Sequence, residues 1–197
     1  MHFEGNTIYH IYNRSYNKKV FYKDANYAFF LNKLKTLRDL CEVLAYCLMP
    51  DHFHLLVYVP QNSGATRLTA QSGLTGIQVL SRKVGTILSS YTQAINKQEK
   101  RSGSLFQPKT KAKDVSSNHY AFNCFHYIHQ NPVKAGLVNK IEDWRYSSFK
   151  EYYENLEAIC NKHLGTELLD IPTNQDLFYK QSYLVINDLL IQKILEL

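Results

Sequence analysis

The sequence predicts an α+β fold in which an antiparallel sheet carries helices on one face. The segment "NTIYHIYNRSY" at residues 6–16 alternates apolar and polar side chains, as expected of a strand with one buried face. The segments "EVLAYCLM" and "HFHLLVYV" are separated only by "PD". This pattern predicts two strands joined in a tight antiparallel hairpin.

Two helices are expected to alternate with these strands. From Asp24, the expected N-cap, apolar side chains recur with helical spacing as far as Cys41, and a second such stripe runs from Ile77 to Ile95. The Gly-, Ser- and Thr-rich residues 61–76 predict a mobile loop between them. The later segment "SLFQPKTKAK" reads as an extended edge strand or loop. The order β-α-β-β-α-β is that of a ferredoxin-like antiparallel sheet.

A third helix is expected over "NHYAFNCFHYIHQ", with Ser116 or Ser117 as its cap. It should end near Asn131, because a proline disfavours helical geometry in the residue before it and residue 132 is Pro. The last residues are helical in pattern and rich in Leu and Ile. We therefore expect one domain over residues 1–155 and a helical C-terminal extension over residues 156–197.

Composition restricts the classes of function. The chain of 197 residues carries a formal net charge of +6 and contains 15 Tyr and 10 Phe, which together favour a polyanionic partner such as nucleic acid. Its four cysteines form no CxxC pair and are expected to be reduced, as in a cytoplasmic protein. No signal peptide or membrane-spanning run is recognisable, so no association with a membrane is expected.

Two histidines at the start of the second hairpin strand form the first candidate site. Residues two apart in a strand point the same way, so His52 and His54 share one face while Phe53 and Leu55 occupy the other. We expect the apolar set to meet the helices and the imidazoles to lie on the open face of the sheet. Two neutral imidazoles can ligate one divalent ion when a third donor arrives, and ordinary surface or hydrogen-bonded histidines are the alternative.

The third helix supplies the second candidate site. Tyr127 and Asn131 are four residues apart and therefore lie on one helical face, opposite Phe125 and Ile128. A phenol and a carboxamide one turn apart can reach the same site. Tyr91 is the rival tyrosine, but it lies on the apolar stripe of its own helix and is expected in the core.

These motifs together resemble a known family. The segments "LMPDHFHLLV", "YIHQNPVKAGLV" and "WRYSSFKEY", with "YHIYNRSYNKKVFYKD" and "SGSLFQPKTKAKD", resemble the single-tyrosine HUH transposases. The resemblance is strongest to the branch called REP-associated tyrosine transposases and to their insertion-sequence relatives. It spans about residues 6–155, and the paired motifs in this order are more specific than the two histidines alone.

The resemblance implies metal-dependent nicking and joining of single-stranded, hairpin-forming DNA at a mobile or repeated element. Tyr127 would be the nucleophile, and His52 and His54 would ligate Mg²⁺ or Mn²⁺. Asn131 would be the third ligand or a positioning group, because insertion-sequence relatives often have the longer Gln there. The implied product is a 5′-phosphotyrosine with a free 3′-hydroxyl, so no nucleotide cofactor is expected, and the chain contains no phosphate-binding GxxxxGK motif. The family leaves both a monomer and a homodimer open.

The basic side chains are candidates for phosphate contacts, which position DNA without reading its sequence. The candidates are Arg14, Arg82, Lys83, Lys97, Lys100, Arg101, Lys109, Lys111 and Lys113.

Three alternatives to a transposase remain. They are a repeat-DNA-binding module without catalytic activity, an HUH replication or plasmid-transfer nickase, and a metal-dependent RNA-binding protein.

Overall fold

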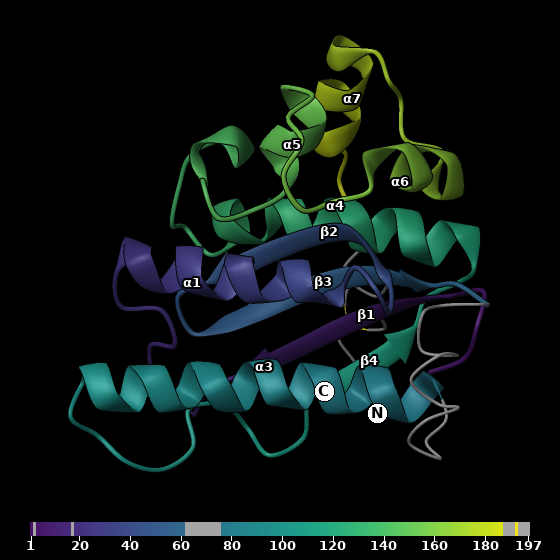
Figure 1. Cartoon of the computed structure of the whole chain (residues 1–197). Coiled ribbons are helices and arrows are strands. Elements are labelled where there is room, and N and C mark those ends of the chain that lie inside the picture. The colour runs from purple at the N-terminus through teal and green to yellow at the C-terminus, as the bar shows by residue number, and fades with distance from the viewer. Residues whose placement is uncertain (2, 17, 62–75, 187–191, 193–197) are drawn as a thin grey trace.

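A computed structural model describes residues 1, 3–16, 18–61, 76–186 and 192 of the chain. Over these ranges an antiparallel sheet has the strand order β2-β3-β1-β4, as Figure 1 shows. This order confirms the predicted α+β, ferredoxin-like fold. The strands are β1 (Thr7–Arg14), β2 (Glu42–Met49), β3 (His52–Val59) and β4 (Lys111–Asp114).

Two helices cover one face of the sheet as predicted. They are α1 (Asp24–Leu34), extended by the 3₁₀ turn η1 (Lys35–Leu37), and α3 (Gly76–Gln98). The predicted loop between β3 and α3 lies mainly at residues 62–75, outside the described residues.

The predicted N-cap of α1 is wrong by one residue. Lys23 is the N-cap, because the side-chain oxygen of Asn26 accepts the backbone N–H groups of Tyr22 and Lys23 at 3.1 and 3.0 Å. The Asp24 carboxylate is thereby left to bind Arg145 at 3.1 Å. Asp24 therefore links α1 to a distant part of the chain and does not cap its own helix.

Aromatic rings fill the core between this face and its helices. Tyr91 of α3 is fully buried beside Phe30 and Phe106, and its hydroxyl donates a 3.0 Å hydrogen bond to the carbonyl of Val20. The placement of Tyr91 in the core is confirmed. This backbone contact supplies the hydrogen-bond partner that the hydroxyl of a buried tyrosine usually has.

The opposite face of the sheet is partly covered by α4 (Asn118–Lys134), which begins after the N-cap Ser117. The prediction that this helix ends near Asn131 is wrong, since it continues through Pro132 to Lys134. Proline removes one N–H donor from a helix. The next turn still closes, because the Ala135 N–H donates to the Asn131 carbonyl at 2.9 Å. Asn131 is therefore held inside a regular helix.

The C-terminal part of the described chain packs on the outer side of α4 (Figure 1). A buried carboxylate joins it to the sheet: Glu151 accepts the Tyr46 hydroxyl at 2.8 Å and the backbone N–H groups of Ile159 and Cys160 at 3.0 and 2.8 Å. The division of the chain at residue 155 stays a prediction, and most of the Leu- and Ile-rich end lies outside the described residues. The elements here are η2 (Ile141–Asp143), α5 (Phe149–Tyr153), α6 (Lys162–Leu169) and α7 (Gln175–Ser182).

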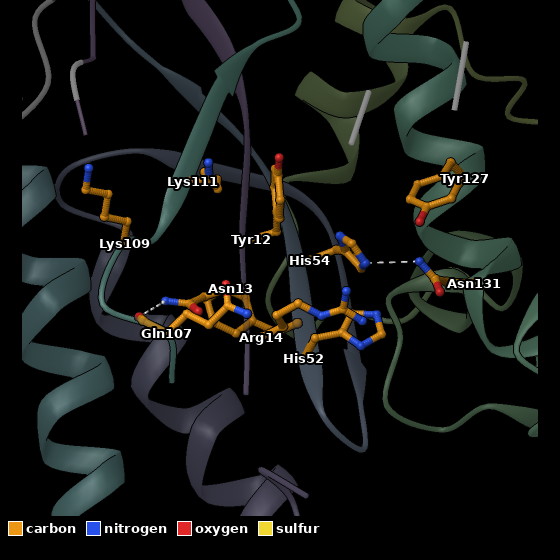
Figure 2. Close-up of a pocket in the computed structure, with 11 residues that line it drawn as sticks. Tyr12, Asn13, Arg14, His52, His54, Gln107, Lys109, Lys111, Tyr127 and Asn131 are labelled. Atoms are coloured by element: carbon orange, nitrogen blue, oxygen red, sulfur yellow. Dashed lines mark hydrogen bonds between the residues drawn. The ribbon is translucent and has the colours of Figure 1, made fainter. Parts of the chain in front are cut away.

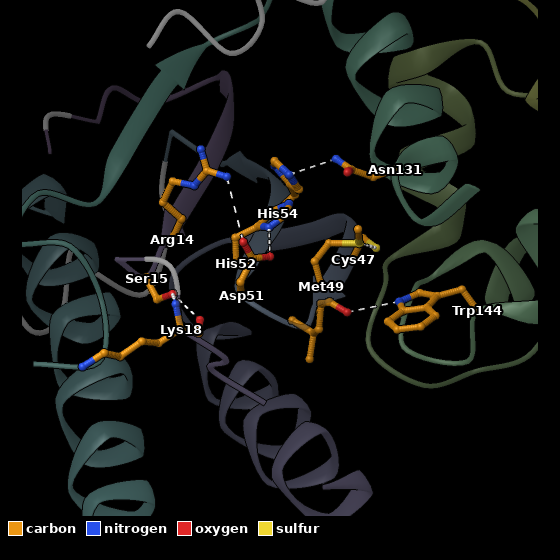
Figure 3. Close-up of polar contacts among 11 residues, drawn as sticks. Arg14, Ser15, Lys18, Cys47, Met49, Asp51, His52, His54, Asn131 and Trp144 are labelled. Atoms are coloured by element: carbon orange, nitrogen blue, oxygen red, sulfur yellow. Dashed lines mark hydrogen bonds and ion pairs between the residues drawn. The ribbon is translucent and has the colours of Figure 1, made fainter. Parts of the chain in front are cut away.

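A short segment of turns, residues 144–148, lies against the outer edge of β2 and forms an isolated bridge between Ser147 and Cys47. The Leu48 N–H donates to the Tyr146 carbonyl at 2.9 Å, and the Ser148 N–H donates to the Tyr46 carbonyl at 3.0 Å. The indole N–H of Trp144 donates to the Leu48 carbonyl at 3.1 Å, a contact drawn in Figure 3. Trp144 therefore anchors this segment against the domain.

All four cysteines, Cys41, Cys47, Cys124 and Cys160, carry free thiols. None of the helices in the described ranges combines the length and apolar character needed to cross a lipid bilayer.

Candidate nucleic-acid and metal site

The strand register assembles the sheet side of the candidate site. Arg14 lies opposite His52, and Tyr12 lies opposite His54, on the antiparallel strands β1 and β3. On its other edge, β1 pairs with β4 so that Tyr12 lies opposite Lys111. Because directly opposed residues of a sheet point to the same face, these side chains form adjacent rows across three strands. The register thus gathers imidazole, phenol and cationic groups from distant parts of the sequence.

Helix α4 supplies the other side of the site. Tyr127 and Asn131 point from this helix toward β3, as Figure 2 shows, while Phe125 and Ile128 are fully buried in the apolar core. The Nδ2 atom of Asn131 lies 3.0 Å from Nε2 of His54. The predicted helical face is confirmed, and it brings the phenol and the carboxamide to the two histidines. The resulting pocket of about 220 Å³ is lined by Tyr12, Asn13, Arg14, His52, Phe53, His54, Gln107, Lys109, Lys111, Tyr127 and Asn131.

The expectation that both histidines lie on an open face is wrong for His54. This side chain is only 3% exposed, because α4 packs across the β2 and β3 strands at this point. Burial is the main reason that the pKa of His54 lies well below its usual value, and the neighbouring His10 and His52 lower it further. His54 is therefore a neutral imidazole at physiological pH. A neutral imidazole is also the form that ligates metals.

His52 lies at the mouth of the same pocket and is partly exposed. Its Nδ1 atom lies 2.6 Å from Oδ1 of Asp51, the residue that precedes it in the hairpin turn. The other carboxylate oxygen of Asp51 lies 4.0 Å from an Arg14 nitrogen. Figure 3 shows Asp51 between these two partners. The hydrogen bond from His52 is the main cause that lowers the pKa of Asp51, which stays ionised.

Tyr127 is a neutral phenol in this environment. Burial raises its pKa to about 12, and a hydrogen bond with Asn131 opposes part of that rise. Its ring lies edge-on to His54, with ring centroids 5.6 Å apart, and the Lys134 ammonium lies 5.6 Å from the ring centroid on the same helix. A phenol with this pKa needs an activating group before it can act as a nucleophile near neutral pH.

The predicted phosphate-contact residues divide into two groups. Arg14, Lys109 and Lys111 line the pocket, and Lys113 follows on the same strand, opposite His10. The others lie on α3 or just after it, on the helix that covers the opposite face, and do not line this pocket. This second group is Arg82, Lys83, Lys97, Lys100 and Arg101. For both groups a contact with DNA stays a prediction.

Some residues of the site were missed by the sequence reasoning. Asp51 was predicted only as part of a turn. A carboxylate directly before an HxH motif could have indicated a hydrogen-bond partner for the first histidine. Asn13 donates through Nδ2 to the Gln107 carbonyl at 3.1 Å and to the Thr110 hydroxyl at 2.8 Å. These bonds fasten the basic segment before β4 to the end of β1. No local pattern in the sequence reveals contacts between residues this far apart.

The donor set suits a divalent cation without forming a complete protein cage. Within the described ranges, no group of three or more His, Cys, Asp and Glu side chains is arranged to hold a metal ion. Two imidazoles and one carboxamide converge instead at His52, His54 and Asn131. A set of two or three protein ligands is typical of catalytic sites, which leave positions for substrate and water. The residues present therefore fit a catalytic cation better than a structural one.

Comparison with known proteins finds similarity to a sequence relative and to solved structures. The chain is 31% identical over 110 residues to a Haemophilus influenzae protein provisionally named a REP-associated tyrosine transposase. The match covers 55% of this chain and 58% of that relative, so the chain spans little more than half of its length. No protein-family model matches the sequence.

The structural neighbour is a REP-associated tyrosine transposase solved in complex with a REP hairpin. It superposes with a TM-score of 0.57 over 78% of this chain and 82% of the neighbour, at 19% sequence identity. At this identity the likeness shows a shared fold. The resemblance first read from the motifs thus extends to a curated relative and to the arrangement of the whole sheet.

Proposed function

The chain is related to the REP-associated tyrosine transposases, and on this basis we propose that it is a metal-dependent endonuclease and strand transferase. Its substrate would be single-stranded, hairpin-forming DNA at a mobile or repeated element. The observation that carries the proposal is the convergence of Tyr127, His52, His54 and Asn131 in one pocket beside Arg14 and Lys111. Nucleophile, metal-ligating groups and cations are the parts that phosphoryl transfer to a tyrosine requires.

Tyr127 is the proposed nucleophile. Its phenolic oxygen loses its proton and attacks the phosphorus of the scissile phosphodiester, the P–O3′ bond breaks, and the leaving 3′-oxygen takes up a proton, so that the number of protons is unchanged. The products are a 5′-phosphotyrosine and a free 3′-hydroxyl. Attack by a 3′-hydroxyl on the phosphotyrosine reverses these changes and releases the phenol. One ester replaces another in each step, so the reaction needs no nucleotide cofactor.

Asn131 holds the nucleophile side of the pocket in place. It lies one helical turn after Tyr127, hydrogen-bonds with that phenol and approaches Nε2 of His54. His52, His54 and Asn131 are the proposed ligands of Mg²⁺ or Mn²⁺. When bound, the cation would polarise the scissile phosphate and offset the negative charge that develops there.

The cationic side chains around the pocket are the proposed binding surface for the DNA backbone. Arg14 of β1, Lys109 of the segment before β4 and Lys111 of β4 itself line the pocket (Figure 2). They are suited to phosphate contacts that position the strand without reading its bases. Recognition of a hairpin is proposed from the structural neighbour, which was solved with a REP hairpin. Both a monomer and a homodimer are compatible with a pocket built from one chain.

The decisive experiment incubates the protein with labelled single-stranded hairpin DNA and Mg²⁺ or Mn²⁺, followed by a denaturing gel. We expect a metal-dependent covalent adduct that Tyr127→Phe abolishes while DNA binding changes by less than about twofold. Tyr91→Phe, which alters a buried phenol of α3, is the matched control and should keep the adduct. Loss of the adduct in Tyr12→Phe but not in Tyr127→Phe would move the nucleophile to β1.

The same assay tests the alternatives. Tight binding that survives chelation, without an adduct on any hairpin, would favour a binding module without catalytic activity. An adduct that forms equally on hairpin and unstructured strands would favour a nickase of the replication or transfer type.

A further inference from the structure

Both ring nitrogens of His54 have a close polar neighbour. Nε2 lies 3.0 Å from Nδ2 of Asn131, and Nδ1 lies 2.9 Å from Nε2 of His10. A carboxamide nitrogen carries only donors, so Nε2 of His54 accepts and holds the lone pair. The proton of the neutral ring is then on Nδ1, from where it is donated to His10. The contacts thus assign one tautomer to His54.

The same tautomer follows for His52 from a different neighbour. An ionised carboxylate only accepts hydrogen bonds, so Nδ1 of His52 donates its proton to Asp51 across the 2.6 Å contact. The lone pair of His52 is consequently on Nε2 as well. Two histidines with unrelated partners at Nδ1 therefore both carry their acceptor lone pair on Nε2.

Both partners are themselves held in place. The His10 side chain has no exposed surface, and its ring is stacked on Tyr12 and on His54, at centroid distances of 4.7 and 5.1 Å. Asp51 occupies the turn between β2 and β3, where its backbone carbonyl accepts the Ser15 N–H at 2.9 Å. His10 is thus fixed by packing, whereas Asp51 is held at its backbone and its carboxylate, 42% exposed, is oriented by its contacts with His52 and Arg14.

We propose that His10 and Asp51 are positioning residues, which accept the Nδ1–H of His54 and of His52 and so hold each Nε2 lone pair in place for a divalent cation. This inference rests on the proposed function, because the cation is what the two lone pairs would share. Partners of this kind fix the orientation of ligating imidazoles and raise their basicity. Removing them commonly weakens metal affinity by about 10- to 100-fold.

The first test reads the tautomers directly in metal-free protein. Long-range ¹H–¹⁵N NMR on protein labelled at histidine nitrogens distinguishes Nδ1–H from Nε2–H. We expect Nδ1–H for both His52 and His54, with His52 shifting toward a mixture in Asp51→Ala, whereas His54 should keep Nδ1–H in His10→Leu because Asn131 still donates to its Nε2. Nε2–H at either histidine in the wild type would overturn the proposal.

The second test measures Mn²⁺ binding by calorimetry and by electron paramagnetic resonance. His10→Leu and Asp51→Ala should each raise the Kd for Mn²⁺ by about 10- to 100-fold. His10→Gln and Asp51→Asn keep an acceptor oxygen and should restore most of the affinity, which also covers the case in which His10→Leu fails to fold. The matched controls are His129→Leu, a buried histidine bonded to Ser148 at 2.8 Å, and Asp24→Ala, and both should bind Mn²⁺ like the wild type.

The role of His10 and Asp51 can be refuted separately from the proposed function. If the wild type binds Mn²⁺ and forms the DNA adduct, but all four variants bind Mn²⁺ equally well, the role of His10 and Asp51 is refuted and the proposed function stands. If the wild type itself binds no Mn²⁺, both the metal part of the proposed function and the role of the pair are refuted.

Discussion

The Asn131 carboxamide nitrogen lies 3.0 Å from Nε2 of His54, although 77 positions separate the two residues in the chain. This contact joins the helix that carries Tyr127 to the strand that carries the paired histidines. It exists because α4 runs unbroken past Pro132, so that Asn131 keeps helical geometry one turn after Tyr127. This contact therefore brings the histidine motif of β3 and the tyrosine motif of α4 together in one site.

The paired histidines should differ in their effect on stability. His52→Ala and His54→Ala are both expected to abolish Mg²⁺-dependent cleavage while the variants remain folded. His54→Ala removes a buried partner that Asn131 and His10 share, so it should cost about 2 kcal/mol more free energy of unfolding than His52→Ala. Urea denaturation measures this difference. Equal losses of stability would contradict the burial of His54.

The pocket cations should contribute to the salt dependence of DNA binding. Arg14→Gln and Lys111→Gln are each expected to reduce the slope of log K against log salt by about 0.7 on single-stranded DNA, because each phosphate contact releases counterions. Lys97→Gln on α3 is the comparison, since Lys97 does not line the pocket. An equal reduction in Lys97→Gln would mean that the strand also crosses α3.

The buried carboxylate of Glu151 should stabilise the C-terminal part of the chain. Glu151→Gln removes the charge that strengthens these hydrogen bonds, and with its oxygen on the two backbone N–H groups its amide nitrogen meets the Tyr46 hydroxyl, which can then no longer donate there. We expect a loss of about 2–3 kcal/mol in the free energy of unfolding. Glu154→Gln, at an exposed ion pair with Lys150, should cost less than about 0.5 kcal/mol. Similar values for both variants would show that the Glu151 contacts contribute little.

Stability should fall on mild acidification because of a buried histidine on α4. Burial lowers the pKa of His126 from 6.5 to about 4, while the nearby Gln181 side chain opposes this. Between these values the unfolded chain binds a proton that the folded chain does not, so the stability present above pH 6.5 is lost as the pH falls toward 4. The contribution of His126 between pH 7.5 and pH 5 is about 2 kcal/mol.

His126→Phe should remove that share of the pH dependence in urea titrations at the two pH values. His54 and His129 have pKa values shifted in the same direction, also by burial, so part of the dependence should remain. A slope unchanged by His126→Phe would show that His126 gains its proton without unfolding.

The local parts of this fold were accessible from the sequence. The bounds of β2 and β3 agree with the predicted hairpin, because continuous apolar runs flanking a Pro-Asp turn leave few other arrangements. The helical face shared by Tyr127 and Asn131 follows from 3.6 residues per turn alone. The helix termini were harder to predict from the sequence. At α1 the Asn26 side chain, and not Asp24, accepts the backbone N–H groups at the start of the helix, and α4 continues through Pro132 with the loss of only one hydrogen bond.

The long-range parts of the site depend on packing that no local pattern encodes. The burial of His54 requires α4 to cross the second face of the sheet, and the sequence indicated only that one face of α4 is apolar. The approach of His10 to His54 is a diagonal relationship between paired strands, which depends on their register. Asp51 was overlooked because aspartate is common in turns and its presence there needs no functional explanation. Register and helix placement are tertiary facts, and they decide which groups become neighbours.

The segment at residues 144–148 has a consequence for how the molecule behaves in a crowded solution. β2 is an almost continuous apolar strand, and an uncovered edge of this kind is a template for intermolecular strand addition and fibril growth. Hydrogen bonds from Leu48 and Ser148 occupy this edge with the molecule's own backbone. The other edge strand, β4, is short and carries Lys111 and Lys113, charges that disfavour pairing between copies. The two edges are thus guarded against aggregation by different means, one by covering and one by electrostatic repulsion.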